Sequence, residues 1–172
     1  MEINGKKAIV IGGASGMGRA TAELLSAKGA SVAVLDREGS DGKAVADGLG
    51  GTFYPVDVTD FDGTEAAINQ AVADLGGLHV IVTTAGGGVA EKTFGKNGPH
   101  SLETFQNTVN LNLIASFNIS RLAAAHMANN EPEDEERGVI INTASIAAFE
   151  GQIGQVAYTA SKAGIAGMCL TM

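Results

Sequence analysis

The segment KKAIVIGGASGMGRATAELLSAKGASVAVLD, residues 6–36, decides the fold of this chain. It begins with the apolar run Ala8–Ile11, which suits a strand buried on both faces of a parallel sheet. A glycine-rich turn follows, and the apolar residues of 17–28 then fall at helical spacing until Gly29 favours a helix end. The apolar run 31–35 predicts a second strand. This order of strand, glycine turn, helix and strand predicts a right-handed βαβ unit.

The glycine turn predicts a phosphate-binding site. A helix N-terminus carries unpaired N–H groups and the positive end of the helix dipole, so it attracts phosphate. Glycine is needed wherever a side chain would collide with a pyrophosphate. The spacing is Gly-x-x-x-Gly-x-Gly rather than G-x-G-x-x-G. The turn residues that we expect to contact a cofactor are Gly12, Ser15, Gly16, Met17 and Gly18.

An acidic residue ends the second expected strand. Asp36 lies 24 residues after Gly12, where a carboxylate can accept hydrogen bonds from both ribose hydroxyls of an adenosine. The same charge would repel the 2′-phosphate of NADP, so the sequence favours NAD. Arg37 is adjacent, and its guanidinium could pair with that phosphate instead.

The rest of the chain continues the alternation of strands and helices. We expect further strands at 52–55, 80–83 and 139–143, and helices at 39–49, 61–75, 102–129 and from Val156 onward. Such alternation predicts an α/β fold with a doubly wound parallel sheet, as a three-layer αβα arrangement. The strand order 3-2-1-4-5 places a ligand at the carboxyl ends of the first and fourth strands. We see no internal repeat or linker, so 1–172 is expected to form a single dinucleotide-binding domain.

The segment SIAAFEGQIGQVAYTASK, residues 145–162, carries the candidate chemistry. Tyr158 and Lys162 are spaced i,i+4, so on a helix they share one face. A phenol beside an ammonium makes an acid–base group for neutral pH, because a positive charge within about 4–6 Å favours the ionised phenol. The pair alone is weak evidence, since this spacing occurs by chance on many helices.

Taken together, these motifs resemble the short-chain dehydrogenase/reductase family with a Rossmann-type NAD(P) fold. GGASGMG resembles the cofactor glycine motif of the family, and Asp57–Val58 resembles its adenine-contacting pair. TTAG, at 83–86, lies where the family usually has NNAG, which makes Thr84, Ala85 and Gly86 expected cofactor contacts. NLIASF, from Asn112, resembles the helix motif with the catalytic Asn. The resemblance covers essentially the whole chain.

The resemblance implies a catalytic tetrad of Asn112, Ser145, Tyr158 and Lys162, which acts with the cofactor in reversible hydride transfer. Tyr158 would exchange the proton on the substrate oxygen, and Lys162 would assist it and hold the nicotinamide ribose. Ser145 would bind the same substrate oxygen, and Asn112 would fix a water that links Lys162 to solvent. Taken alone, Ser145 and Asn112 are also compatible with structural roles, and Asp57 could cap the following helix.

Residues 137–168 and two loops, around 96–101 and at 130–138, are similar to the 3-hydroxyacyl-CoA dehydrogenases within the family. This implies NAD as cofactor, acyl-CoA or another alcohol or ketone as substrate, a role in fatty acid metabolism and a homotetramer. Family members continue past the last helix seen here, with two more strands and a substrate loop, so we expect the chain to be a fragment. The apolar stripe Leu111, Ile114, Phe117 and Leu122 fits either a tetramer interface or packing on the chain's own sheet.

Charge and composition limit the kinds of protein that this chain could be. The net charge of −8 argues against a general affinity for nucleic acid or anionic membrane, and no apolar run approaches the ~18 residues of a membrane span. The only cysteine, Cys169, excludes an intrachain disulfide and suggests a reducing compartment. We expect it to be a small buried side chain and the protein to be cytoplasmic, without a signal peptide. The three histidines, His79, His100 and His126, have no metal-ligand spacing, so no metal site is expected.

Other functions stay open at this level. A different alcohol or ketone oxidoreductase of the family, including a 3-oxoacyl-thioester reductase that uses NADPH, would share every motif. A non-catalytic dinucleotide-binding module would need no Ser–Tyr–Lys set. A methyltransferase would share the glycine turn, but its chemistry does not call for Tyr158 and Lys162.

Overall fold

The apolar runs pair into one parallel sheet in the computed structural model, which describes residues 1–172. The five strands lie in the order β3-β2-β1-β4-β7, so the predicted 3-2-1-4-5 arrangement is confirmed. Neighbouring strands are all parallel. Their bounds are β1 Lys7–Ile11, β2 Ser31–Asp36, β3 Thr52–Pro55, β4 Val80–Thr83 and β7 Val139–Asn142.

The chain divides into two units, which we describe separately. Unit 1 comprises Met1–Ala85 and Asn118–Asn142, and it contains the whole five-stranded sheet. Unit 2 comprises Gly86–Phe117 and Thr143–Met172.

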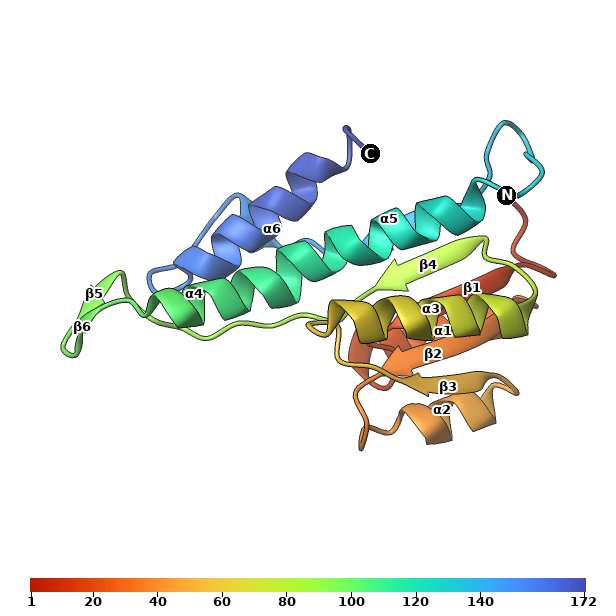
Figure 1. Ribbon diagram of the computed structural model, residues 1–172, viewed down its shortest axis with the longest axis horizontal. Helices are drawn as coiled ribbons and strands as arrows, with labels where there is room; N and C mark the ends of the chain where they lie inside the picture. The colour runs from red at the N-terminus through yellow and green to blue at the C-terminus, as the bar shows by residue number, and fades with distance from the viewer. The chain divides into compact units, whose positions relative to one another are not determined.

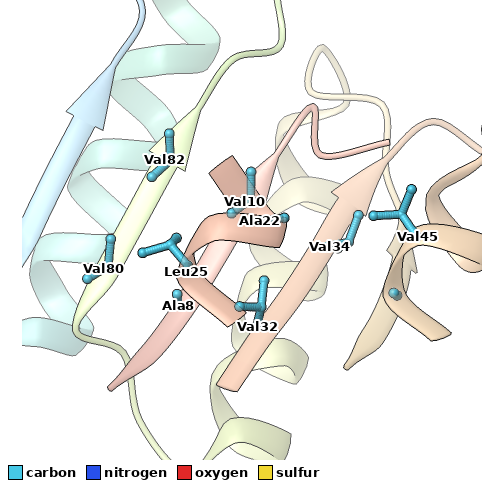
Figure 2. Packing of buried hydrophobic residues seen from close by; sticks show 10 residues of the cluster. Ala8, Val10, Ala22, Leu25, Val32, Val34, Val45, Val80 and Val82 are labelled. Carbon is cyan, nitrogen blue, oxygen red and sulfur yellow. The ribbon is translucent and has the colours of Figure 1, made fainter. Parts of the chain in front are cut away.

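Helices cover both faces of the sheet in unit 1, as the three-layer expectation requires (Figure 1). The side chains of one face pack with α1 (Gly16–Ala27) and α2 (Gly42–Gly48). Figure 2 shows this cluster, in which alternate strand residues lie with Ala22 and Leu25 of α1 and with Val45 of α2. Its strand members are Ala8, Val10, Val32, Val34, Val80 and Val82. Each fully buried valine contributes roughly 1.5–3 kcal/mol.

The alternate residues of the same strands face the opposite layer, because side chains alternate along a strand. Ile9, Leu35 and Ile81 are among the fully buried ones. Helix α3 (Phe61–Leu75) contributes the buried Ile68 to this layer. It begins at the N-cap Asp60, whose carboxylate accepts from Gly63 N–H at 3.1 Å, and it ends at Gly76 in the left-handed conformation.

Unit 2 is built around one long helical segment. Helix α4 (Leu102–Val109) continues through a π-helical turn at Asn110–Ile114 into α5 (Ala115–Met127), whose later residues belong to unit 1. Helix α6 (Val156–Met168) packs on α4 and on the π turn. Gly164 permits this approach, because a Cβ there would lie 2.8 Å from Cδ1 of Leu113.

Four local features differ from the sequence prediction. The single regular helix expected over 102–129 contains the π turn, and α2 begins at Gly42 because Gly39, with φ of +81°, still belongs to a turn. A short antiparallel hairpin, β5 (Phe94–Gly95) and β6 (Gly98–Pro99), lies where only a polar loop was expected. A single 3₁₀ turn, Ile146–Ala148, precedes α6.

The expectation for Cys169 was wrong. Its thiol is free and the residue is exposed, because it follows the last residue of α6, beyond the packed part of the helix. None of the helices is long and apolar enough to cross a membrane.

A half-buried histidine, His79, makes the stability of unit 1 depend on pH. His79 Nδ1 accepts a hydrogen bond from the Lys7 backbone N–H at 3.2 Å, next to the start of β1. Burial, followed by the positive charges of Lys6 and Lys7, lowers the pKa of His79 below its usual 6.5. The neutral ring is therefore the form that the folded chain stabilises.

We expect the free energy of unfolding to fall as pH drops from about 7.5 to about 5. The reason is that His79 binds a proton at a higher pH in the unfolded chain than in the folded chain. This contribution is complete above the unfolded pKa and is lost as pH falls through the lower, folded pKa. A His79→Asn variant, which offers an acceptor that does not titrate, should lose less stability over this range. Urea unfolding at several pH values measures both chains, and equal losses would contradict the assignment.

Candidate active site

The glycine turn after β1 is in close contact with the backbone after β4. Gly12 has φ of +82°, and a Cβ there would lie 2.6 Å from both Thr84 Oγ1 and Ala85 N. A Cβ at Gly18 would overlap the carbonyl oxygen of Gly12. Both positions therefore require glycine, the first also because of its left-handed backbone.

The opposite side of the turn is open. Gly16 has φ of +51°, and no atom lies within 4 Å of the place of its missing Cβ. Ser15, the N-cap of α1, makes no side-chain capping bond, and the first turn has no acidic residue. Gly16 and Met17 are exposed. The first N–H groups of α1 are thus free to bind an anion, which fits the diphosphate of a dinucleotide.

Thr84 fixes this turn from the side of β4. Its hydroxyl lies 3.1 Å from Ile11 O and 3.2 Å from Gly12 O, and its backbone N–H donates to Ile11 O at 2.8 Å. Ala85 N–H reaches the same Ile11 carbonyl at 3.3 Å. The two residues expected to contact the cofactor are thus packed against the backbone of the turn.

The Asp36 carboxylate is held at the end of β2. Its Oδ2 accepts from Ala14 N–H at 2.9 Å, and its Oδ1 accepts from Arg37 N–H at 2.7 Å. These bonds orient an acidic group beside the glycine turn while Arg37 itself is exposed. A carboxylate fixed here suits a pair of ribose hydroxyls.

Asp57 and Val58 follow β3. Asp57 Oδ1 accepts from Thr59 N–H at 2.9 Å and from Thr59 Oγ1 at 2.7 Å, and these hydrogen bonds lower the pKa of Asp57. Val58 is buried. The alternative that Asp57 caps the next helix was wrong, since Asp60 does so.

A buried lysine dominates the second group of candidate residues, in unit 2. Lys162 is only 4% exposed, and its Nζ donates to Thr143 O at 2.7 Å. The same Nζ lies 5.5 Å from the centre of the Tyr158 ring, within the range of a cation–π contact. Both residues lie on α6 four positions apart, as predicted. Burial lowers the pKa of Lys162.

Ser145 begins the 3₁₀ turn that leads toward α6. Its Oγ accepts from Ala147 N–H at 3.2 Å, which fixes the side chain. Because the oxygen acts as an acceptor here, its hydrogen is available to a substrate oxygen.

Asn112 lies in the π turn and is fully buried. Its Nδ2 donates to Gly87 O at 2.6 Å and to Thr108 O at 2.8 Å, while its Oδ1 accepts from Gly87 N–H at 3.1 Å. The side chain therefore holds both backbone groups of Gly87. π turns of this kind are frequently found at functional sites.

Gly86 lies against both Asn112 and Lys162. A Cβ at this position would lie 2.7 Å from Asn112 Oδ1 and 3.5 Å from Lys162 Nζ. The structure thus brings Gly86, Asn112, Tyr158 and Lys162 together within unit 2, with Ser145 on the adjoining turn. A pocket of about 290 Å³ opens beside Tyr158, lined also by 87–90 and Gln155.

Two residues of this group were missed by sequence reasoning. Thr143 supplies the carbonyl for Lys162, and Gly87 is the partner of Asn112. Both act through the backbone, so the type of side chain carries little signal. Only their positions in the sequence offered a hint. Gly87 lies in the run of three glycines at 86–88, and Thr143 lies two positions before Ser145.

Comparison with known proteins agrees with this geometry. A profile of the short chain dehydrogenase family matches residues 6–172. The chain is 52% identical over 167 residues to a 3-hydroxyacyl-CoA dehydrogenase type-2 of Drosophila melanogaster, with 94% of this chain covered. It is 50% identical over 173 residues to the Bos taurus protein of the same name, with 98% covered. It spans 66% of the length of each.

A solved structure of a 3-hydroxyacyl-CoA dehydrogenase type-2 from Mycobacterium avium superposes with a TM-score of 0.92 at 43% identity. The match covers 99% of this chain and 69% of that one. A short chain dehydrogenase from Mycobacterium smegmatis gives a TM-score of 0.85 at 28% identity, over 97% of this chain and 69% of that one. The fold, the order of the motifs and these matches lead to one conclusion: the chain belongs to the short chain dehydrogenase family.

Proposed function

We propose that this chain is an NAD-dependent oxidoreductase that interconverts a secondary alcohol and a ketone, with 3-hydroxyacyl-CoA and 3-oxoacyl-CoA as the substrate pair. The observation that carries the proposal is the buried Lys162 ammonium beside the Tyr158 ring, next to a pocket. The names of the relatives support the choice of substrate.

Tyr158 is proposed as the acid–base group that exchanges a proton with the substrate oxygen. Its ring lies 5.5 Å from the Lys162 ammonium, and a side chain positioned in this way can exchange a proton with a reacting group. Burial disfavours the charged form of Lys162, whereas the Thr143 carbonyl and the Tyr158 ring stabilise that form. Ser145 would donate a hydrogen bond to the same substrate oxygen and orient it.

Asn112 is proposed to act in the proton relay to Lys162 that the family resemblance implies. Its side chain holds Gly87, and Gly86 lies against both Asn112 and Lys162. The same contacts would keep the Lys162 ammonium in place during proton transfer.

The free N–H groups around Gly16 and Met17 would hold the cofactor diphosphate, and Asp36 would accept hydrogen bonds from the adenosine ribose. The bound nicotinamide supplies the hydride acceptor or donor. We propose Gly12, Ser15, Gly18, Asp57, Val58, Thr84, Ala85 and Gly86 as the remaining residues of this site. A 2′-phosphate would meet the Asp36 charge, so NAD is proposed rather than NADP.

We further propose a homotetramer in the cytoplasm. On the long helix Leu122 is buried, whereas Ile114 and Phe117 are 39% and 45% exposed, so these two side chains are available to a partner chain. The exposed free thiol of Cys169 suits a reducing compartment. Chromatography with light scattering would measure the assembly.

A Tyr158→Phe variant should lose about 10²–10⁴-fold in turnover, since it lacks the proton-transfer hydroxyl. The assay is NADH oxidation with acetoacetyl-CoA, and NADH binding measured by fluorescence should be unchanged. Tyr54→Phe is the matched control, because Tyr54 is the other tyrosine and its hydroxyl bonds to Asp74 in unit 1. Near-normal turnover in Tyr158→Phe would disprove the proposed mechanism.

An Asp36→Ala variant should shift preference from NADH toward NADPH by about tenfold or more, because it loses both the ribose acceptor and the repulsion of the 2′-phosphate. Titration of both cofactors gives the ratio of their dissociation constants. Glu38→Ala removes a nearby exposed charge and should leave that ratio unchanged. Tighter binding of NADPH than NADH by the parent chain would contradict the role of Asp36 and favour Arg37 as a phosphate ligand.

A further inference from the structure

One acidic residue, Glu91, connects three segments of unit 2. Its backbone N–H donates to Gly154 O at 2.8 Å, in the loop that enters α6. Its Oε1 accepts from Ser101 N–H at 3.0 Å, at the N-cap of α4. Its carbonyl oxygen lies 3.1 Å from Nδ1 of His100, the residue that follows the β5–β6 hairpin. A single residue thus joins the base of the hairpin, the start of α4 and the approach to Tyr158.

The sequence neighbours of Glu91 line two pockets: Ala90 lines one and Lys92 lines the other. The Tyr158 pocket is lined by 87–90 and Gln155, the residues on one side of Glu91 and Gly154 in sequence. A second pocket, of about 680 Å³, is lined by 92–94, 151–154 and three residues of α6, Val156, Thr159 and Ala160. The hydrogen bond from Glu91 N–H to Gly154 O therefore joins the residues that directly adjoin the two lining segments of the Tyr158 pocket, 87–90 and Gln155.

The His100 ring lies beside the Glu91 carboxylate. The His100 side chain is 10% exposed, and its Nε2 is buried without a hydrogen-bond partner, 3.8 Å from Glu91 Oε2. The ring packs edge-on against Phe105 of α4, with 6.2 Å between ring centres. The carboxylate thus lies between a fixed imidazole and the Ser101 amide.

A negative charge is favourable at this place. The N-terminus of α4 carries the positive end of its dipole, and Ser101 Oγ already accepts from Thr104 N–H at 3.2 Å. The Glu91 carboxylate accepts from the backbone N–H of Ser101, the N-cap residue of α4. A charge-assisted hydrogen bond therefore connects the segment around Glu91 to the start of this helix.

We propose that Glu91 is a positioning residue, which keeps the wall of the Tyr158 pocket formed so that a 3-oxoacyl thioester enters a preorganised site. This inference rests on the proposed function. Asn112 and Lys162 are held by their own contacts with Gly87 and Thr143. Loss of Glu91 should therefore weaken substrate binding more than it slows the chemical step.

The test compares the parent chain with Glu91→Ala, Glu91→Gln and Glu103→Ala. In Glu91→Ala we expect KM for acetoacetyl-CoA to rise about tenfold, the change that follows loss of one charge-assisted hydrogen bond, with kcat within about threefold. Glu91→Gln retains an oxygen acceptor and should restore most of the affinity. Glu103→Ala removes an exposed charge from the first turn of the same helix and should change neither constant.

Amide hydrogen exchange provides a readout that does not need activity. The amides of Ser101 and Glu91 should exchange about tenfold faster in Glu91→Ala and at the parent rate in Glu103→Ala. Unchanged exchange, an unchanged KM, or an equal effect of Glu103→Ala would each overturn the proposal. A parent chain without turnover would instead refute the proposed function, and the exchange rates alone would then decide whether Glu91 fastens these segments.

Discussion

The burial of the Lys162 ammonium is the constraint on which the candidate catalytic residues depend. A charged amine only 4% exposed is unfavourable unless polar groups replace its water. The Thr143 carbonyl, at 2.7 Å, and the face of the Tyr158 ring take that place. They also fix the distance between the cation and the phenol, so the contacts that make the burial tolerable are those that the proposed proton transfer uses.

The same region is organised mostly by backbone groups. Asn112 uses its amide to hold Gly87 rather than another side chain, and Gly86 has no side chain because one would collide with Asn112. In unit 1 the glycine turn also packs closely against a neighbouring segment, since Gly12 contacts Thr84 and Ala85 directly. Close backbone packing is what preorganises a site, because few rotamers remain to be ordered when a ligand binds.

Sequence reasoning succeeded where side-chain pattern and fold coincide. The uninterrupted apolar runs of β1 and β4 predicted central strands, and Asp36 appears at the end of β2 as expected. It failed where the backbone conformation has no signal in the pattern of side chains. Nothing local in 110–114 signals a π turn, and the hairpin at 94–99 depends on two glycines in a segment that reads as polar loop. The domain assignment and the roles of the site residues stay predictions.

The sequence by itself determined the family, the strand order and the identity of the candidate cofactor and catalytic residues. The strands and helices follow from periodicity, and the family and the catalytic residues follow from the resemblance of the motifs to those of the family; both are read from local stretches of the chain. Only the tertiary structure decided which partners hold those residues: Thr143 for Lys162, Gly87 for Asn112, and Ser101, His100 and Gly154 for Glu91. Most of these partners contribute backbone amides and carbonyls, which nearly every residue carries, so their pairing becomes visible only when the folded chain brings them together.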